Sequence, residues 1–491
     1  MRLAMTTAWN RSNGLLTLAM VGSLIGIGGC GRNTVDPSVA ADTVPPTAPA
    51  ALAATTDGPF GVSLSWQPSI DDKLVTGYRV ERCQGGGCSA FAQIAAPSGA
   101  SFTDTGLQAA TSYSYKVRAA DAAANFSAYS NVASATTDLP PAPPVAVLPA
   151  WVTALSIGQW FPIPNTAMSS VAPAPTPAGN TGPQSKVLAW TSFVVDARTS
   201  KVYSLANGGH NDYSGNEVDV LDLEIDQPAW SQLVAPTPNA QLTNCQLYYA
   251  DDRPAARHTY YGVTLNEFND RFMLFGGANW CVNGGFFTGI SSFNITAKTW
   301  SPSTTHGTLP SAFAGVPAYS LDPSTGDVYA FHEFHYGRWS RSTNTFSTLN
   351  PGGSGPEGLE AMSAMDTARG RILIAGGLHG NDRHLYTLSS NAFTAVTFGG
   401  ASATVVPSAA QGGMAYVAAI DRFLFRLDGA GGDVYQIHPS TFEVTAFATT
   451  GGAAIPLTQN GPYNKFLYVP RLNGFVYVPG YSGNAWFLRA H

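Results

Sequence analysis

The sequence predicts an all-β protein in which a small β-sandwich precedes a six-bladed β-propeller, with a seven-bladed propeller as the alternative. The first observation is composition: of 491 residues, 51 are Gly, 34 are Pro and only 11% are charged, which favours strands joined by many turns. The second is a period-two alternation of apolar and polar residues in short runs, as in residues 62–66. The third is a β unit that recurs roughly every 40 to 70 residues from about residue 186.

Residues 1–30 predict an export signal. Arg2 and Arg11 precede an apolar run. Its end, Leu24-Ile25-Gly26-Ile27-Gly28-Gly29-Cys30, resembles a bacterial lipobox. That resemblance implies cleavage before Cys30, lipidation of its thiol, and a membrane-anchored protein of the bacterial cell envelope, at the outer membrane or the cell surface. The alternative is an ordinary signal peptide or membrane anchor with an incidental Cys. Residues 31–44 then form a polar, Pro-rich tether.

The chain contains five Cys residues, of which one is assigned to the lipid. An exported protein tends to oxidise the other four. Cys83 and Cys88 are close enough to join one hairpin, which leaves Cys245 and Cys281 to pair across two loops. Zinc ligation is the less favoured alternative, because the two pairs lie in different domains and neither has CxxC spacing.

Residues 45–138 predict the sandwich, because alternating runs are separated by turn clusters at the spacing of such a domain. Trp66 on an early strand, Tyr78 on the next, Tyr113 and the closing Tyr129-Ser130-Asn131 resemble a fibronectin type III domain over nearly all of this segment. The resemblance implies that Trp66, Tyr78 and Tyr113 are core residues. It also implies a spacer, as in bacterial secreted glycan-degrading enzymes. Residues 139–155 are predicted to be a stiff Pro-rich linker.

Residues 156–491 predict the propeller. Five copies of the unit lie at residues 187–234, 257–303, 316–349, 361–398 and 412–448, and their fourth strands carry Trp230, Trp300, Phe346, Phe393 and Phe442. A sixth copy lacks its fourth strand, which residues 158–163 supply, so that the two ends of the domain pair. The Phe-Gly-Gly strand ends and the strand from Asn294 to Trp300 resemble kelch repeats. The ring as a whole is similar to the galactose-oxidase-type propeller.

Loops expected on one face of the propeller contain many chemically active side chains. The loop between strands two and three of a blade shares a face with the loop that leads into a blade. Six of the nine His residues fall in these loops: His210, His258, His332, His335, His379 and His384. A concave mouth with convergent polar groups is the usual form of a ligand site. The alternative is that loops are polar anyway and the grouping is incidental.

An acidic sugar fits this set of side chains. Elimination on a uronate needs its carboxylate neutralised, together with a base and an acid. The predicted catalytic pairs are His210 with Tyr213 and His258 with Tyr260. The predicted substrate-binding residues are Asn211, Asn216, Arg257, Trp280, Arg338 and Arg383, with Trp280 stacking on a pyranose and the arginines pairing with a carboxylate. The set is similar in fold and residue type to propeller polysaccharide lyases such as the ulvan lyases, which implies β-elimination of uronate-containing glycans.

Other functions stay open beside the lyase. A non-catalytic propeller would bind glycan or protein as a surface receptor or adhesin. A hydrolase would need paired carboxylates, for which Glu357 with Glu360 or Asp212 are the candidates. A copper-radical oxidase of the galactose oxidase type would need an unpaired Cys245 or Cys281.

Cofactors and partners are only partly constrained by the sequence. The cofactor is unknown, although His332, His335 and His379 could bind a divalent metal such as zinc. A net charge of −6 without a basic stripe argues against nucleic acid. The expected partner is an acidic polysaccharide or another glycan, and we expect a monomer.

Overall fold

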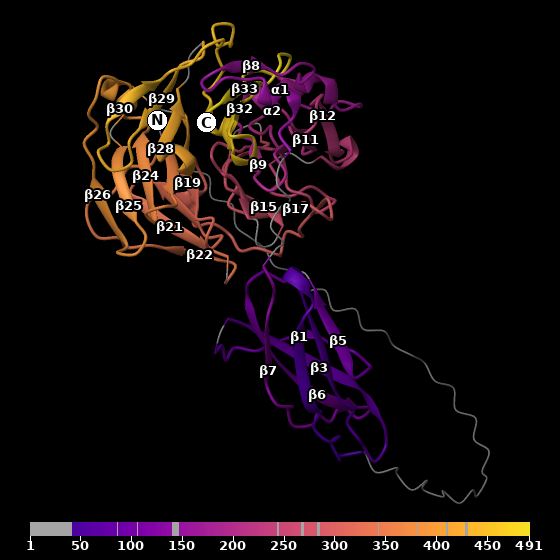
Figure 1. Ribbon diagram of the computed structural model, residues 1–491. Coiled ribbons are helices and arrows are strands. Elements are labelled where there is room, and N and C mark those ends of the chain that lie inside the picture. The colour runs from indigo at the N-terminus through magenta and orange to yellow at the C-terminus, as the bar shows by residue number, and fades with distance from the viewer. Residues whose placement is uncertain are drawn as a thin grey trace, which may run out of the picture. The chain divides into compact units, whose positions relative to one another are not determined.

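The computed structural model describes residues 42–491 except 86, 106, 140–146, 243–244, 267–269, 282–284, 342, 381, 409–410 and 428–430. The export signal, Cys30 and residues 31–41 of the tether lie outside the described residues. The described part is all-β (Figure 1). Within it, no helix has the length and apolar character needed to cross a membrane.

Two antiparallel sheets form the first domain. One contains β1 (Ala50–Thr56), β2 (Gly61–Gln67) and β5 (Ser101–Thr105); the other contains β4 (Ala92–Ala95), β3 (Val75–Gln84), β6 (Ser112–Asp121) and β7 (Ala133–Thr136) in that order. Trp66, Tyr78 and Tyr113 are buried in the shared core, as predicted. The Tyr113 hydroxyl accepts a hydrogen bond from the backbone N–H of Gln108 at 3.0 Å, which satisfies the polar end of a buried ring.

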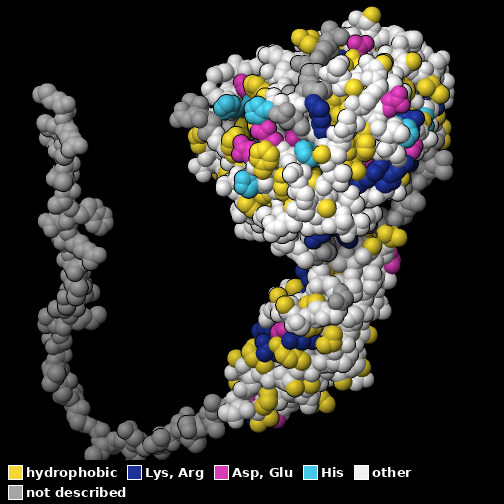
Figure 2. Space-filling view, turned by 90° about the vertical axis from the view of Figure 1, so that its left-hand side faces the viewer, with side chains coloured by type: hydrophobic (Ala, Val, Ile, Leu, Met, Phe, Trp, Pro, Cys, Tyr) yellow, Lys and Arg dark blue, Asp and Glu magenta, His cyan; other side chains and the backbone are white. Residues whose placement is uncertain are grey.

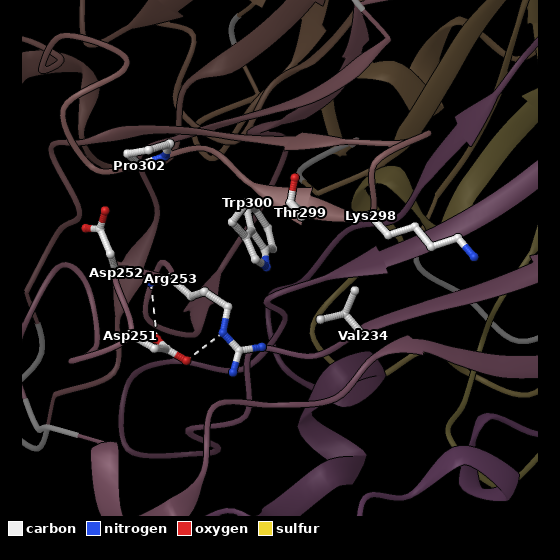
Figure 3. A pocket seen from close by; sticks show the side chains of 8 residues that line it. All are labelled: Val234, Asp251, Asp252, Arg253, Lys298, Thr299, Trp300 and Pro302. Atoms are coloured by element: carbon white, nitrogen blue, oxygen red, sulfur yellow. Dashed lines mark hydrogen bonds and ion pairs between the residues drawn. The ribbon is translucent and has the colours of Figure 1, made fainter.

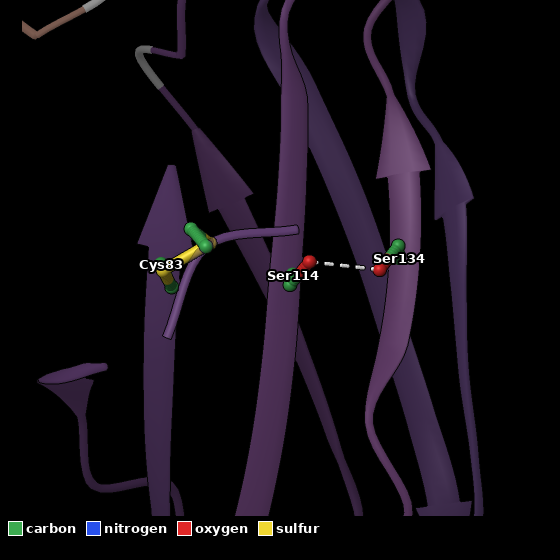
Figure 4. Close-up of a disulfide and its surroundings, with 4 residues drawn as sticks. Cys83, Ser114 and Ser134 are labelled. Atoms are coloured by element: carbon green, nitrogen blue, oxygen red, sulfur yellow. Dashed lines mark hydrogen bonds between the residues drawn. A yellow bond between two sulfur atoms is a disulfide. The ribbon is translucent and has the colours of Figure 1, made fainter. Parts of the chain in front are cut away.

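Both predicted disulfides are present. Cys83 is bonded to Cys88, and Cys245 is bonded to Cys281. Figure 4 shows the first disulfide in the sheet where Ser114 of β6 and Ser134 of β7 lie with their hydroxyl oxygens 2.8 Å apart. Since Cys245 and Cys281 are bonded to each other, neither thiol is available for a Tyr–Cys copper centre.

Among the described residues, six four-stranded antiparallel sheets follow the first domain (Figure 1). The first three contain β9 (Val194–Asp196), β10 (Lys201–Leu205), β11 (Val218–Asp222) and β12 (Trp230–Val234); β14 (Val263–Asn266), β15 (Arg271–Phe275), β17 (Ile290–Asn294) and β18 (Thr299–Trp300); and β19 (Ala318–Leu321), β20 (Val328–His332), β21 (His335–Ser340) and β22 (Thr345–Thr348). The last three contain β23 (Met362–Asp366), β24 (Arg371–Gly376), β25 (Asp382–Thr387) and β26 (Ala392–Ala395); β27 (Gly413–Val417), β28 (Arg422–Arg426), β29 (Val434–Ile437) and β30 (Val444–Phe447); and β31 (Phe466–Val469), β32 (Gly474–Tyr477), β33 (Trp486–Arg489) and β8 (Trp160–Pro162).

The two ends of this part of the chain meet in the sixth sheet. Leu488 of β33 lies opposite Trp160 of β8, and Trp486 lies opposite Pro162. The Trp160 indole is buried and donates a hydrogen bond to the Gly432 carbonyl at 2.9 Å. The prediction that residues 158–163 supply the missing fourth strand is confirmed by this pairing.

The first strands of the six sheets are neighbours in a cyclic order. β9 contacts β14, β14 contacts β19, β19 contacts β23, β23 contacts β27, β27 contacts β31, and β31 contacts β9. Backbone hydrogen bonds also join the loops that lead into these strands, from Tyr260 to Trp190, from Gln411 to Glu360 and from Tyr463 to Gln411. These leading loops therefore lie together at one end of the first strands.

Three local predictions of the repeat pattern are wrong. Val187 lies in a one-turn helix, α2 (Ser185–Leu188), closed by the bond from Ala189 N–H to the Ser185 carbonyl, so the first sheet begins at β9. The chain turns between Thr259 and Gly262, which separates β13 (Arg257–His258) from the second sheet and leaves it paired with β16 (Ala278–Asn279). Phe442 lies in a turn before β30, with φ +57°.

Candidate functional site

The loop after β10 is shaped by its glycines. Gly209 has φ +83°, and a Cβ at this position would come within 2.5 Å of the His258 backbone nitrogen, so only glycine fits. His210 and Asn211 follow in the left-handed region, with φ +43° and +65°. The Asp212 N–H then closes the turn on the Gly209 carbonyl at 2.7 Å. His210 is exposed at the tip, and Asp212 is directed back towards β13.

Asp212 and His258 form a partly buried pair. His258 Nε2 lies 2.9 Å from Asp212 Oδ2; the imidazole is fully buried, while 28% of the Asp212 side chain is exposed. The hydrogen bond from His258 lowers the pKa of Asp212, and burial lowers the pKa of His258. Near neutral pH the pair is therefore an ionised carboxylate that faces solvent, supported by a neutral imidazole that donates to it.

Three further side chains surround the His258 imidazole. The centroid of its ring lies 5.2 Å from that of Trp190, 5.5 Å from that of His210 and 5.9 Å from that of Tyr260. His210 comes from a loop between strands two and three, while Trp190 and Tyr260 come from leading loops. The two kinds of loop therefore meet here, as the sequence predicted, and the pair of His258 with Tyr260 is brought together.

A pocket of about 340 Å³ opens in front of Asp212. It is lined by Thr181, Gln184, Ser185, Leu188, Ala189, Trp190, Asp212, Gln459 and Asn460. The Thr181 hydroxyl donates to Asp212 Oδ1 at 3.1 Å, and the Asn460 amide donates to the Leu188 carbonyl at 2.9 Å, so both polar residues are held in place. The described lining thus combines hydroxyl, amide and carboxylate groups with one indole, and it contains neither Arg nor an exposed Lys.

A second polar cluster lies at the loop that leads into the fourth sheet. His379 Nδ1 lies 2.8 Å from Glu357 Oε2. Asp382 is buried and accepts hydrogen bonds from the backbone N–H groups of Glu357 and Gly358 at 2.8 and 2.9 Å. Burial raises the pKa of Asp382 to about 6, against the effect of these two hydrogen bonds. Figure 2 shows His side chains beside acidic and hydrophobic ones on one face of the molecule.

The raised pKa of Asp382 predicts a pH-dependent stability. A carboxyl whose pKa is higher in the folded chain binds protons more tightly there, so its contribution to stability is lost as the pH rises from about 4 to about 7. A shift from 3.8 to about 6 corresponds to about 3 kcal/mol. Denaturant unfolding should therefore show that wild type loses about 3 kcal/mol of unfolding free energy relative to Asp382→Asn between about pH 4 and about pH 7. If the difference in unfolding free energy between wild type and Asp382→Asn does not change with pH, the raised pKa of Asp382 is contradicted.

Two predicted catalytic or binding residues are buried out of reach of a substrate. The Tyr213 ring is fully buried and its hydroxyl donates to Glu217 Oε1 at 2.7 Å, so the predicted pair of His210 with Tyr213 does not form. Arg257 is also fully buried: its guanidinium lies 3.6 Å from the Phe287 ring centroid and donates to Ser291 Oγ at 3.0 Å. The predictions for Tyr213 and Arg257 are wrong because core contacts already occupy both side chains.

Asn216 and Trp280 are structural as well. The Asn216 amide donates to Thr237 Oγ1 and to the Pro254 carbonyl, and its oxygen accepts from the Thr237 N–H, which uses its hydrogen-bonding capacity. Trp280 is 7% exposed and packs against Tyr249, so it offers no open face to a sugar. Both substrate-binding predictions are therefore corrected.

Asn211, Arg338, Arg383 and the three His residues predicted to bind a metal are not among the residues that line the pocket in front of Asp212, although Asn211 precedes Asp212 in the same loop. Arg338 on β21 pairs with Asp327 at 3.7 Å, and Arg383 on β25 is exposed. Among the described residues, the ligand atoms of His332, His335 and His379 do not all lie within 4.8 Å of one another. His332 Nδ1 instead contacts the Ala312 carbonyl at 2.6 Å, so the predicted metal set is not preformed.

Trp190, Thr181 and Asn460 are site residues that the sequence reading missed. Trp190 lies in the leading loop of the first sheet. His258 and Tyr260 were selected because leading loops are expected to contribute to the mouth. The same expectation selects Trp190 when the first repeat begins at β9 rather than at Val187. Nothing in the local sequence marks Thr181 or Asn460, because tertiary contacts bring them to Asp212 and Leu188.

Comparison with known proteins identifies the first domain. Residues 47–136 match the fibronectin type III domain family. The chain is 38% identical over 126 residues to an alpha-amylase of Niallia circulans and 41% identical over 106 residues to exoglucanase B of Cellulomonas fimi. The matched segments cover 26% and 22% of this chain, and 9% of each relative.

Solved structures match the same class of domain. The crystal structure of a Fn3-like protein from Clostridium thermocellum is 25% identical, with 18% of this chain and 92% of that chain covered and a TM-score of 0.17. The family match is the basis for the assignment, and the sandwich of β1 to β7 agrees with it. Residues 47–136 of this chain are a fibronectin type III domain.

Proposed function

We propose that residues 156–491 form a six-bladed β-propeller of the kelch-like kind. The six consecutive four-stranded sheets and the cyclic contacts of their first strands support the proposal. The pairing of β8 with β33 supports it further, since a ring joined through its two chain ends leaves no open sheet edge at that point. On this arrangement the leading loops form the mouth, and the pocket in front of Asp212 lies at that mouth.

We further propose that this mouth binds a glycan. The main supporting observation is the pocket itself, in which the half-buried Trp190 indole lies beside a carboxylate, three amides and hydroxyl groups. Sugars present alternating apolar ring faces and hydroxyls, and this combination of an aromatic wall with a few oriented polar groups suits them. The fibronectin type III domain adds support, because the relatives that share this segment are named as an alpha-amylase and an exoglucanase.

Recognition is favoured over β-elimination. A uronate lyase needs a cation to neutralise the substrate carboxylate, and among the described residues that line the pocket no Arg is present. Tyr213 is buried against Glu217 and cannot serve as the acid. The pocket also contains a single carboxylate, Asp212, whereas hydrolysis of a glycosidic bond uses two. The glycan-binding function is therefore proposed as non-catalytic, with the fibronectin type III domain as a spacer and the N-terminal lipid as the anchor.

The test is glycan binding by Asp212→Ala and Trp190→Ala, measured by calorimetric titration of the full chain with soluble starch, cellulose and chitin oligosaccharides and with polygalacturonate. Each substitution is expected to weaken binding about tenfold or more, the effect of truncating an anchor residue at the centre of a site. The matched control is Asp222→Ala, because Asp222 on β11 is also bound by a nitrogen-bearing side chain, that of Lys201, and has a similar exposed fraction.

Two results would contradict the proposal. One is wild-type affinity in both variants. The other is an absorbance rise from unsaturated uronate when polygalacturonate is added to wild type, which would establish a lyase.

A further inference from the structure

A second pocket, of about 330 Å³, lies beside β18, the edge strand of the second sheet. It is lined by Val234, Asp251, Asp252, Arg253, Lys298, Thr299, Trp300 and Pro302 (Figure 3). We propose that this pocket is a second glycan site, which binds one neutral pyranose ring against Trp300. The inference extends the proposed glycan-binding function to a separate surface.

Trp300 is a fixed aromatic wall. It lies on the short strand β18 opposite Phe293 of β17, and the two rings pack edge to face with their centroids 5.2 Å apart. This contact with Phe293 fixes the orientation of the indole. Because Trp300 is only half-buried, part of its ring remains open to the pocket. A rigid aromatic face of this kind provides a large contact area at little cost in side-chain entropy.

Arg253 is held in place beside the indole. Its Nε donates to Asp251 Oδ2 at 2.6 Å and its Nη1 donates to the Ala235 carbonyl at 2.7 Å. Asp251 is itself fixed by the Thr237 hydroxyl at 2.9 Å. Two of the guanidinium nitrogens are thus used for positioning, and within the described chain Nη2 has no hydrogen-bond partner from the protein. A ligand hydroxyl can accept from Nη2 without displacing an existing bond.

The charges of the pocket point to a neutral sugar. Asp251 and Asp252 balance Arg253 and Lys298, so the lining has no excess positive charge to select a uronate. Figure 3 shows Asp252 and Lys298 at opposite ends of the pocket, with Arg253 and Trp300 between them. A carboxylate acceptor and an ammonium donor at the two ends match the hydroxyls on the two sides of a pyranose ring, which both donate and accept hydrogen bonds.

The two proposed sites can be separated because the lining of this pocket shares no residue with the lining of the pocket in front of Asp212. We would titrate the full chain with cellohexaose, maltohexaose, chitohexaose and trigalacturonate and determine the number of binding equivalents. Wild type is expected to bind a neutral oligosaccharide at two sites. Trp300→Ala is expected to weaken one of them about tenfold, and Trp190→Ala the other.

Conservative variants keep the result interpretable. Trp300→Phe retains an aromatic face and is expected to keep most of the affinity of this pocket. Arg253→Gln removes the guanidinium and is expected to weaken sugar binding at the same pocket while the protein core stays intact. The inference is overturned if wild type binds one equivalent that only Trp190→Ala removes, if none of the neutral sugars binds, or if trigalacturonate is preferred at this site. An equivalent that only Trp300→Ala removes would overturn the proposed mouth site and leave this inference standing.

Discussion

Replacing Lys186 by Met is expected to lower the free energy of unfolding at pH 7 by about 3 to 5 kcal/mol, the usual cost of leaving a buried charge without its partner. Lys186 Nζ lies 2.7 Å from Asp219 Oδ2 and 3.1 Å from Glu217 Oε1, and the three side chains are at most 1% exposed. Methionine keeps the length and volume of the side chain but removes the ammonium. Two carboxylates would then remain buried, and among the described side chains only the Tyr213 hydroxyl would still donate to Glu217.

The sign of the pH dependence follows from the same geometry. Burial, opposed by Lys186, raises the pKa of Asp219 in the folded chain. This pKa is about 7 in wild type, and without Lys186, which lowers it, the pKa is higher still, so the variant takes up its proton at a higher pH. The defect of Lys186→Met should therefore grow as the pH rises above about 7 and shrink as the pH returns to about 7. Urea unfolding of wild type and Lys186→Met at several pH values measures this defect as a difference in unfolding free energy.

The matched control for Lys186→Met neutralises the whole cluster. In the variant Lys186→Met, Glu217→Gln, Asp219→Asn no buried charge is left, and we expect much of the lost stability to return. If the single and the triple variant are equally unstable, the loss comes from packing rather than from the unpaired carboxylates.

Trp160→Ala is expected to destabilise residues 156–491 by about 3 to 5 kcal/mol, as for other buried Trp truncations. The indole is 2% exposed and lies against Gly432 and Gly452, where a Cβ would come within 2.8 Å of its ring. It also donates to the Gly432 carbonyl, which accepts a second hydrogen bond from Thr449 Oγ1, so truncation leaves a cavity and removes one of these two hydrogen bonds. Because β8 completes the sixth sheet, the variant should also expose the edge of β33 and associate more readily.

Calorimetry and light scattering check this prediction, with Trp66→Ala as the matched control. Trp66 is buried in the sandwich core, so its truncation should lower the transition of residues 45–138 alone. If the unfolding transition of residues 156–491 is unchanged in Trp160→Ala, pairing of β8 with β33 contributes little to their stability.

The elements that the sequence predicted well are those set by local patterns. Period-two alternation located β2 and β6, and the inward positions of these strands carry Trp66 and Tyr113 as expected. Cys83 and Cys88 pair because five residues of separation suit one hairpin. The pairing of residues 158–163 with β33 was also predictable, because a repeat without its fourth strand requires one from elsewhere.

The site was predicted less well, because residue type does not report burial. Tyr213 and Asp212 are adjacent in one Gly-bounded loop, yet Tyr213 is fully buried against Glu217 while Asp212 lines a pocket. In the same way Arg257 and His258 alternate along β13, and the side chains of neighbouring strand residues point to opposite faces. His258 meets Asp212, and Arg257 meets Phe287.

The sequence by itself determined the all-β class, the repeated four-stranded unit and the two disulfides, since composition, periodicity and spacing are properties of the chain. The resemblance of residues 45–138 to fibronectin type III domains indicated the family of the first domain. Only the tertiary structure decided which polar side chains face solvent. Thr181, Trp190, Asp212 and Asn460 come from separate loops, and contacts between distant segments bring them to one pocket. The same contacts bury Lys186 between Glu217 and Asp219, where desolvation makes the loss of one charge without the others costly.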